Sequence, residues 1–180
     1  MLMRAEQSSL LIVDVQERLA PVMSDPRRVI AGCALLMRAA SRLDVPVVVS
    51  EQYPKGIGPT VFDLREWIPA DGAVAKLAFS CADEPAVMER IAAPARPQVV
   101  MAGIEAHICV LQTALGLKER GYEVFVAADA SASRRTENET AAWDRLRSAG
   151  IATVTTEMVV FEWLRRAGTP AFKDLVALVK

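Results

Sequence analysis

Residues 9–15 have the sequence SLLIVDV, and this stretch decides the fold. A short aliphatic run bounded by polar residues predicts a strand that is buried on both faces. In residues 26–43 apolar side chains recur at the spacing of one helix face, and PVVVS at 46–50 is a second β-branched run. A strand, a helix and a strand in this order predict a parallel βαβ unit.

The same alternation continues to the end of the chain. Further strands are predicted at 73–77, 98–103, 122–129 and 151–156, and further helices at 84–91, 106–120, 137–149, 157–167 and 171–180. We therefore expect an α/β fold with three α/β/α layers around a mostly parallel, six-stranded, Rossmann-like sheet. Residues 51–73 contain three prolines and three glycines and predict a long excursion. Loops of that length in a compact domain are usually functional.

Length and charge restrict the class of protein. A chain of 180 residues without linkers or repeats is expected to form a single domain over residues 1–180. The 21 basic and 22 acidic residues give a net charge of −1 and form no basic stripe. This distribution argues against a nucleic-acid partner.

The cysteines and the apolar runs bear on the cellular compartment. Arg4 and Glu6 precede the first apolar run, which does not fit a signal peptide, and no run is long enough to cross a bilayer. Cys33, Cys81 and Cys109 are odd in number and lack CxxC spacing, which indicates reduced thiols. We therefore expect a cytoplasmic protein without a membrane partner.

Chemistry is expected where the strands end, because ligands of open parallel sheets bind outside the carboxyl ends of the strands. Asp14 ends the first strand, Lys76 ends the third, and Cys109 follows the fourth. An acid, an amine and a thiol can therefore converge at one edge of the sheet. Asp129, at the end of the fifth strand, is expected to bind the following loop, ASASRR, rather than a metal.

Each of these residues has a functional and a structural interpretation. Cys109 lies in the first turn of a predicted helix, where N–H groups and a nearby ammonium favour a thiolate, but it could also pack as a small apolar residue. Asp14 would be poorly solvated after LLIV and needs a partner, unless it caps a helix or braces a loop. Lys76 could equally be a solvated surface lysine.

No cofactor or metal is predicted. The GIG of PKGIGPTV lacks the third glycine and the helix start of a dinucleotide fingerprint, and the chain has no P-loop and no GxSxG elbow. His107 is the single histidine, so zinc sites that need two or three imidazoles are excluded within one subunit.

These residues resemble the isochorismatase-like hydrolase superfamily over nearly the whole chain. The match consists of IVDVQ with Asp14 and Gln16, AKLAFS with Lys76, and GIEAHICV with Cys109. The stretches EQYPKGIGPTV and EMVVFEWL are similar to a subgroup of small isochorismatase-domain proteins.

The resemblance implies a cysteine hydrolase. Asp14 would take the proton of Cys109, Lys76 would keep that carboxylate ionised, and the thiolate would form a covalent intermediate that water hydrolyses. The family also has a non-proline cis peptide before the cysteine helix, here between residues 104 and 105, and nearby N–H groups would form an oxyanion hole. The residues expected to bind substrate or to form this hole are Gln16, Ile104, Glu105 and His107.

Departures from relatives narrow the expected reaction. Residues 106–108, AHI, are similar to true isochorismatases, but those typically lack the cysteine, so Cys109 argues against vinyl-ether cleavage. Nicotinamidases of the family hold a metal with an Asp and two His, which a chain with one histidine does not match. The expected activity is amide or carbamoyl C–N hydrolysis of a small molecule. Two alternatives are a catalytically silent oligomeric scaffold or binding protein, and a thiol-redox protein using Cys109.

Large apolar side chains outside the predicted core strands suggest self-association. Such groups usually mark interfaces when they form exposed patches, so we expect a homo-oligomer. The alternative is that they cover the domain's own core, notably Phe161. The residues are Tyr53, Phe62, Trp67, Phe161 and Trp163.

Overall fold

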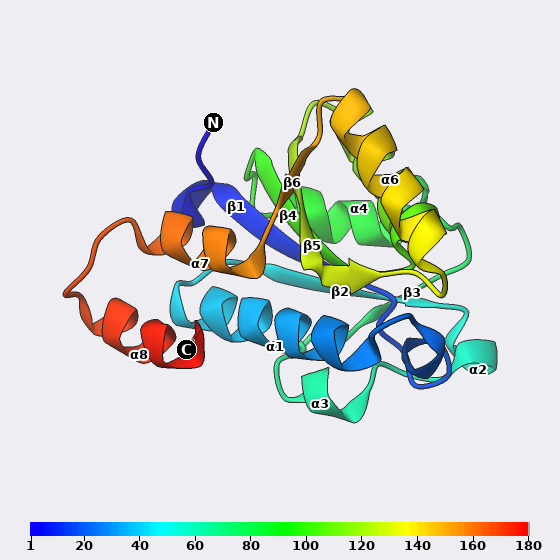
Figure 1. Cartoon of the computed structure of the whole chain (residues 1–180), viewed down its shortest axis with the longest axis horizontal. Coiled ribbons are helices and arrows are strands. Elements are labelled where there is room, and N and C mark those ends of the chain that lie inside the picture. The colour runs from blue at the N-terminus through cyan, green and yellow to red at the C-terminus, as the bar shows by residue number, and fades with distance from the viewer. Residues whose placement is uncertain (180) are drawn as a thin grey trace.

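Figure 1 shows the structure, a computed structural model that describes residues 1–179. Within these residues all strand pairs are parallel and form one six-stranded sheet of order β3-β2-β1-β4-β5-β6. The expected α/β architecture is thereby confirmed. The strands are β1 (Ser8–Val13), β2 (Val47–Gln52), β3 (Val74–Lys76), β4 (Gln98–Ile104), β5 (Glu123–Ala132) and β6 (Ala152–Val154).

Helices cover both faces of the sheet (Figure 1). One face carries α1 (Pro26–Arg42), α3 (Phe62–Arg65), α7 (Thr156–Leu164) and α8 (Pro170–Val179). The other carries α4 (Pro85–Ala92), α5 (Leu111–Glu119) and α6 (Thr136–Ser148). Within residues 1–179 no helix is long and apolar enough to span a membrane.

The sequence of β1 follows from its place in the middle of the sheet. Leu10 and Ile12 pack into the core under α1, whereas Leu11 and Val13 pack into the core under α5, and none of the four is exposed. A strand covered on both faces buries every side chain, which is why residues 10–13 are uninterrupted aliphatics.

A glycine at the end of β4 allows it to approach β1 closely. Gly103 has φ of +124°, and an added Cβ would collide with the backbone of Val13. Only glycine fits a position with this φ and this approach. The carboxyl ends of β1 and β4 are therefore held together immediately before Asp14 and Glu105.

The excursion predicted at 51–73 is partly regular. Its first two residues extend β2, because Ser50 to Gln52 pair with Val74 to Lys76 of β3. The remainder of the excursion includes α2 (Pro54–Ile57) and α3, two helices of four residues each. Short 3-10 turns are η1 (Ala5–Gln7), η2 (Ala20–Val22) and η3 (Cys81–Asp83).

The helix predicted at 106–120 consists of two parts. A π-helical turn, η4 (Ala106–Val110), carries Cys109 and is followed by α5. The wider turn arises because Val110 N–H donates to the carbonyl of Glu105, five residues earlier. The last predicted helix corresponds to α8, and its final residue, Lys180, lies outside the described residues.

Candidate active site

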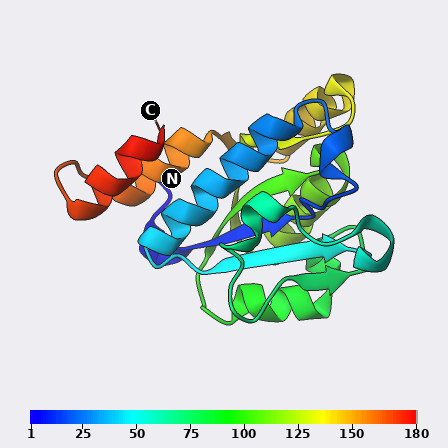
Figure 2. The same cartoon turned by 90° about the horizontal axis from the view of Figure 1, so that it is seen from below.

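Asp14 and Lys76 meet at the carboxyl edge of the sheet. Strands β3, β2 and β1 are neighbours, and Figure 2 shows them running toward the end of the molecule where α2 lies. Asp14 follows β1 with φ of +53°, a left-handed conformation that Asp tolerates better than most residues. Its backbone N–H donates to the carbonyl of Ser50 at 3.2 Å, which fixes the turn against β2.

The two charged groups form a buried ion pair. Lys76 Nζ lies 2.8 Å from Asp14 Oδ2, and neither side chain is exposed to solvent. Asp14 Oδ1 accepts a hydrogen bond from Ser50 Oγ at 2.7 Å, and Oδ2 faces the ammonium of Lys76. The two carboxylate oxygens therefore have different partners.

The ammonium of Lys76 is held by neutral acceptors as well. It donates to Gln52 Oε1 at 2.6 Å and to the carbonyls of Ala78 and Phe79, each at 3.0 Å. Burial lowers the pKa of Lys76, but the charge of Asp14, with smaller effects from Cys109 and Cys81, outweighs burial and raises it. Lys76 is thus a permanent cation beside Asp14, and its interpretation as a solvated surface lysine is wrong.

Cys109 shares this environment as a thiol. Its residue is 5% exposed, and burial followed by the charge of Asp14 raises the pKa of the Cys109 thiol to about 12, against the opposing effect of Lys76. Desolvation and the carboxylate oppose the ammonium and the helix start, which by themselves favour a thiolate. A thiol beside an ionised carboxylate is an arrangement in which the base can remove the proton during attack.

Sequence reasoning missed two polar residues of β2. Ser50 donates to Asp14 and Gln52 accepts from Lys76, so alternate residues of one strand brace both partners of the ion pair. The available signal was the polar pair at positions 50 and 52 directly after the buried run VVV. Cys81 was also missed: its Sγ lies 3.5 Å from Ser50 Oγ, and the residue is fully buried.

The side-chain amide of Gln16 is hydrogen-bonded within the protein. Its Nε2 donates to the carbonyls of Gln52 (3.0 Å) and Gly58 (2.7 Å), and its Oε1 accepts from Gln52 N–H at 2.7 Å. Both amide hydrogens of Gln16 therefore already have partners within the protein, and its substrate contact stays a prediction. The hydrogen bonds of this side chain connect the end of α2 to β2.

The segment before Cys109 contains the other expected binding residues. The peptide bond between Ile104 and Glu105 is cis, and Ile104 is fully buried. Glu105 is 5% exposed and its Oε2 accepts from Arg134, through the backbone N–H at 3.1 Å and Nε at 3.0 Å.

His107 is half-buried and held by two neighbours. Its Nδ1 lies 2.8 Å from Ser133 Oγ, and its Nε2 lies 3.3 Å from Asn138 Nδ2. A substrate contact of His107 would therefore compete with Asn138.

Asp129 differs from its expected role. Its carboxylate accepts from the backbone N–H of Thr156 at 2.8 and 3.0 Å and from Thr156 Oγ1 at 2.8 Å. Asp129 therefore stabilises the start of α7 and does not bind the loop that follows it, because β6 brings Thr156 alongside β5. Among the described residues no group of three or more His, Cys, Asp or Glu side chains is arranged to hold a metal ion.

The aromatic residues divide into buried and exposed members. Trp163 is 3% exposed and donates from Nε1 to Ser8 Oγ, so its expected interface role is wrong. Trp67 packs under the guanidinium of Arg38. Several large apolar side chains remain exposed, among them Val22, Tyr53, Phe62, Leu77 and Phe79.

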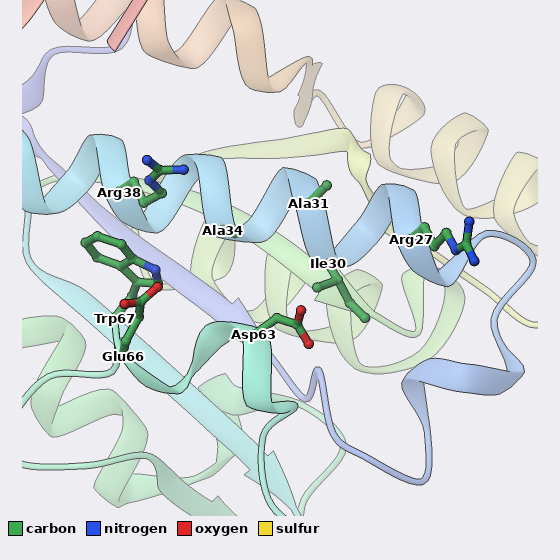
Figure 3. Close-up of a pocket in the computed structure, with 8 residues that line it drawn as sticks. All are labelled: Arg27, Ile30, Ala31, Ala34, Arg38, Asp63, Glu66 and Trp67. Atoms are coloured by element: carbon green, nitrogen blue, oxygen red, sulfur yellow. The ribbon is translucent and has the colours of Figure 1, made fainter. Parts of the chain in front are cut away.

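Two hollows lie in the surface near these elements. One, of about 460 Å³, adjoins the ion pair and is lined by Tyr53, Leu77 and Glu84 among others. The other, of about 400 Å³, lies between α1 and α3. Figure 3 shows Arg27, Ile30 and Arg38 of α1 facing it across from Asp63 and Trp67. The lining residues of this second hollow include neither a thiol nor any member of the Asp14 cluster.

Known proteins resemble this chain over most of its length. The isochorismatase domain model matches residues 8–158. Isochorismatase domain-containing protein 2 of Danio rerio is 38% identical over 175 residues, which cover 96% of this chain and 86% of that protein. The structure of MAR1 ribonuclease from Caenorhabditis elegans superposes with a TM-score of 0.92 at 32% identity, covering 99% of this chain and 92% of that one.

A further solved structure is similar in fold. The YcaC gene product of Escherichia coli, described as an octameric hydrolase of unknown specificity, has a TM-score of 0.92 at 24% identity. The superposition covers 99% of this chain and 90% of that one.

Proposed function

This chain belongs to the isochorismatase family, and on that premise we propose that it hydrolyses an amide or carbamoyl C–N bond of a small molecule through Cys109. Family membership supports a small-molecule hydrolase, and the bond and the mechanism are our proposal. The observation that carries it is the fully buried Asp14–Lys76 pair, whose two charges both act on the thiol of Cys109. Burying two charges is costly and is common where their chemistry is used. We also propose that residues 1–180 form a single isochorismatase-like hydrolase domain.

In the proposed acylation step, Asp14 Oδ2 takes the proton of Cys109 while Sγ attacks the carbonyl carbon of the substrate. The C–S bond forms, the carbonyl electrons move to oxygen, and backbone N–H groups near Glu105 and Cys109 would stabilise the oxyanion. The intermediate collapses by breaking the C–N bond, and the proton on Asp14 passes to the leaving nitrogen. Throughout this exchange Lys76 remains protonated and offsets the negative charge.

In the proposed deacylation step, water attacks the thioester. Asp14 accepts a proton from that water, the C–S bond breaks, and the proton returns to sulfur while the acid product leaves. Each turnover thus consumes one water and restores Asp14 as a carboxylate and Cys109 as a thiol.

The decisive experiment is to trap the acyl-enzyme. We would incubate the protein with a panel of small primary amides and carbamoyl compounds, measure ammonia release, and quench in acid for mass spectrometry. The expected result is a mass increase equal to the acyl group on the peptide that contains Cys109. A scaffold protein would acquire no acyl group, and a redox protein would acquire only oxygen or a disulfide on the thiol.

RNA is included as a separate substrate because one relative is named as a ribonuclease. The net charge of −1 and the absence of a basic run in the sequence do not favour a polyanionic substrate. We expect a labelled RNA oligonucleotide to stay intact under conditions in which an amide acylates Cys109. Cleaved RNA without any acylation of Cys109 would overturn the proposal.

Limited alkylation should identify Cys109 as the most reactive thiol. Cys33 and Cys81 are 0% exposed, whereas Cys109 is 5% exposed and has Asp14 as a proton acceptor, so a reagent should reach Cys109 first although the pKa of its thiol is raised as well. With substoichiometric iodoacetamide, peptide mapping should find the label first on residue 109. Earlier labelling of Cys33 or Cys81 would contradict the assignment.

A homo-oligomer is also part of the proposal. Exposed large apolar side chains such as Tyr53, Phe62 and Phe79 support self-association, because exposed apolar surface that is gathered in a patch usually becomes an interface. Light scattering at micromolar concentration should give a mass well above the 19.5 kDa of one chain. A mass of one chain at all concentrations would reject self-association.

A cytoplasmic location is likewise proposed, and it is supported by three cysteines that are all free thiols.

A further inference from the structure

The hollow between α1 and α3 has two walls of opposite charge. Arg27 and Arg38 of α1 lie along one side, and Asp63 and Glu66, within and directly after α3, lie along the other (Figure 3). All four residues are exposed, and the hollow has a volume of about 400 Å³. These two sides are called the cationic wall and the acidic wall below.

The charges of both walls lack ion-pair partners. Within residues 1–179 none of the four side chains forms an ion pair. Arg38 lies over the ring of Trp67, 5.7 Å from its centroid, a contact that leaves its charge without a carboxylate. Arg28 of the same helix provides a contrast, since it pairs with Glu139 at 3.2 Å. Both walls are therefore available to pair with charges of another molecule.

The surface between and beside the walls is apolar. Ile30, Ala31 and Ala34 of α1 line the hollow, and the two alanines allow another surface to approach the helix closely. Phe62, the first residue of α3, is 79% exposed and directly precedes Asp63. Covering such a ring removes apolar area from water, and aromatic rings are frequent energetic anchors of protein interfaces. Apolar and charged groups thus occur together here, as they do in an interface.

A second copy of the chain presents the groups that this surface lacks. In a two-fold contact, residue i of one copy meets residue j of the other, and j meets i. With the two-fold axis at the hollow, the cationic wall of each copy faces the acidic wall of the other, and each Phe62 ring covers apolar surface of the partner. A partner of uniform charge would satisfy only one of the two walls.

We propose that a second copy of this chain docks on this surface, related to the first by a two-fold axis at the hollow between α1 and α3. This inference rests on the proposed function, which includes a homo-oligomer, and it names the surface through which the copies associate. Because the hollow contains no member of the Asp14 cluster, the contact and the chemistry of Cys109 can be tested separately.

The test reverses the charge of one wall at a time. The variant Arg27→Glu/Arg38→Glu makes both walls acidic, and the variant Asp63→Lys/Glu66→Lys makes both walls cationic. Sedimentation equilibrium over a range of concentrations measures the mass of the wild-type protein, of each variant alone, and of an equimolar mixture of the two variants.

Each wall variant alone should associate weakly, whereas their mixture should associate like the wild type. The apparent dissociation constant of each variant should rise about 100-fold or more, because like charges meet at two places in each contact. In the mixture the acidic walls of one variant face the cationic walls of the other, so the wild-type mass should return. Recovery on mixing also shows that both variants are folded.

Two further variants separate this contact from a general effect of charge. Phe62→Ala leaves every charge in place and should raise the apparent dissociation constant about 30-fold, as for the loss of an aromatic anchor. Arg135→Glu/Arg145→Glu reverses two exposed arginines at and within α6, on the other face of the sheet. This control should stay within about threefold of wild type, because only the screened long-range field changes.

The remaining outcomes contradict the proposal or its premise. If the wall variants keep the wild-type mass, the copies associate through another surface and the proposal is wrong. Loss in both variants without recovery in the mixture would show that the walls do not face each other, and an equal loss in the control would show a general charge effect; either result would overturn the proposal. If the wild-type protein is a single chain at every concentration, the proposed homo-oligomer fails and this contact fails with it, whereas acylation of Cys109 stays a separate result.

Discussion

Replacing Lys76 with methionine is expected to lower the free energy of unfolding by about 3–5 kcal/mol, the usual cost of leaving a buried charge without its partner. The carboxylate of Asp14 would keep only the hydrogen bond from Ser50 Oγ. Methionine has nearly the length of lysine, so the loss reports the missing charge more than a missing volume. Urea unfolding at neutral pH measures the effect.

Two controls make this prediction specific. The double variant Asp14→Asn/Lys76→Met should be more stable than Lys76→Met alone, because it removes the uncompensated carboxylate. Lys118→Met should change stability by less than about 0.5 kcal/mol, since Lys118 is exposed. A loss below about 1 kcal/mol for Lys76→Met would show that the ion pair is not tightly coupled to folding.

The pH dependence of this contribution follows from the direction of the pKa shift. Asp14 raises the pKa of Lys76 above its ordinary value despite burial, so the folded protein binds that proton more tightly than the unfolded chain. The stabilisation is complete below the unfolded-state pKa and is lost only as the pH rises through the folded-state pKa. The difference between wild type and Lys76→Met should therefore persist through neutral pH and shrink only in strongly alkaline solution.

Replacing Cys109 with alanine is expected to abolish hydrolysis, with a loss in kcat of about 10⁴-fold or more, as for nucleophiles that act together with a base. Cys109→Ser should be nearly as inactive, because a hydroxyl is a much weaker acid than a thiol and Asp14 would have to deprotonate it. Cys33→Ala, which removes a thiol from the core under α1, should keep kcat within about threefold. Activity of Cys109→Ala near the wild-type level would exclude the covalent mechanism.

The same assay tests metal independence. A hydrolytic zinc needs about three protein ligands, usually including histidine, and His107 is the single histidine of the chain. The proposed mechanism obtains its electrostatic stabilisation from Lys76 and backbone N–H groups. Turnover should therefore survive exhaustive treatment with EDTA. Loss of turnover on chelation with recovery on adding zinc would contradict this prediction.

The convergence of Asp14 and Lys76 was predictable from the sequence, whereas the protonation state of Cys109 was not. Parallel strands place their carboxyl ends at one edge, so a polar residue after each buried run must lie there. The acidity of a thiol, however, depends on how much water and which charges surround it. Burial and Asp14 give Cys109 a pKa of about 12, and no sequence pattern reports that balance.

The sequence by itself determined the order of strands and helices along the chain, the parallel sheet and the residue types at its carboxyl edge. These features follow from hydrophobic periodicity, which is a local property of the chain. Only the tertiary structure decided the partners of those residues. Ser50 binds Asp14 across 36 positions, Gln52 binds Lys76 across 24, and Arg134 binds Glu105 across 29. Hydrogen bonds between groups so far apart depend on strand register and packing, and the burial that packing brings strengthens each of them.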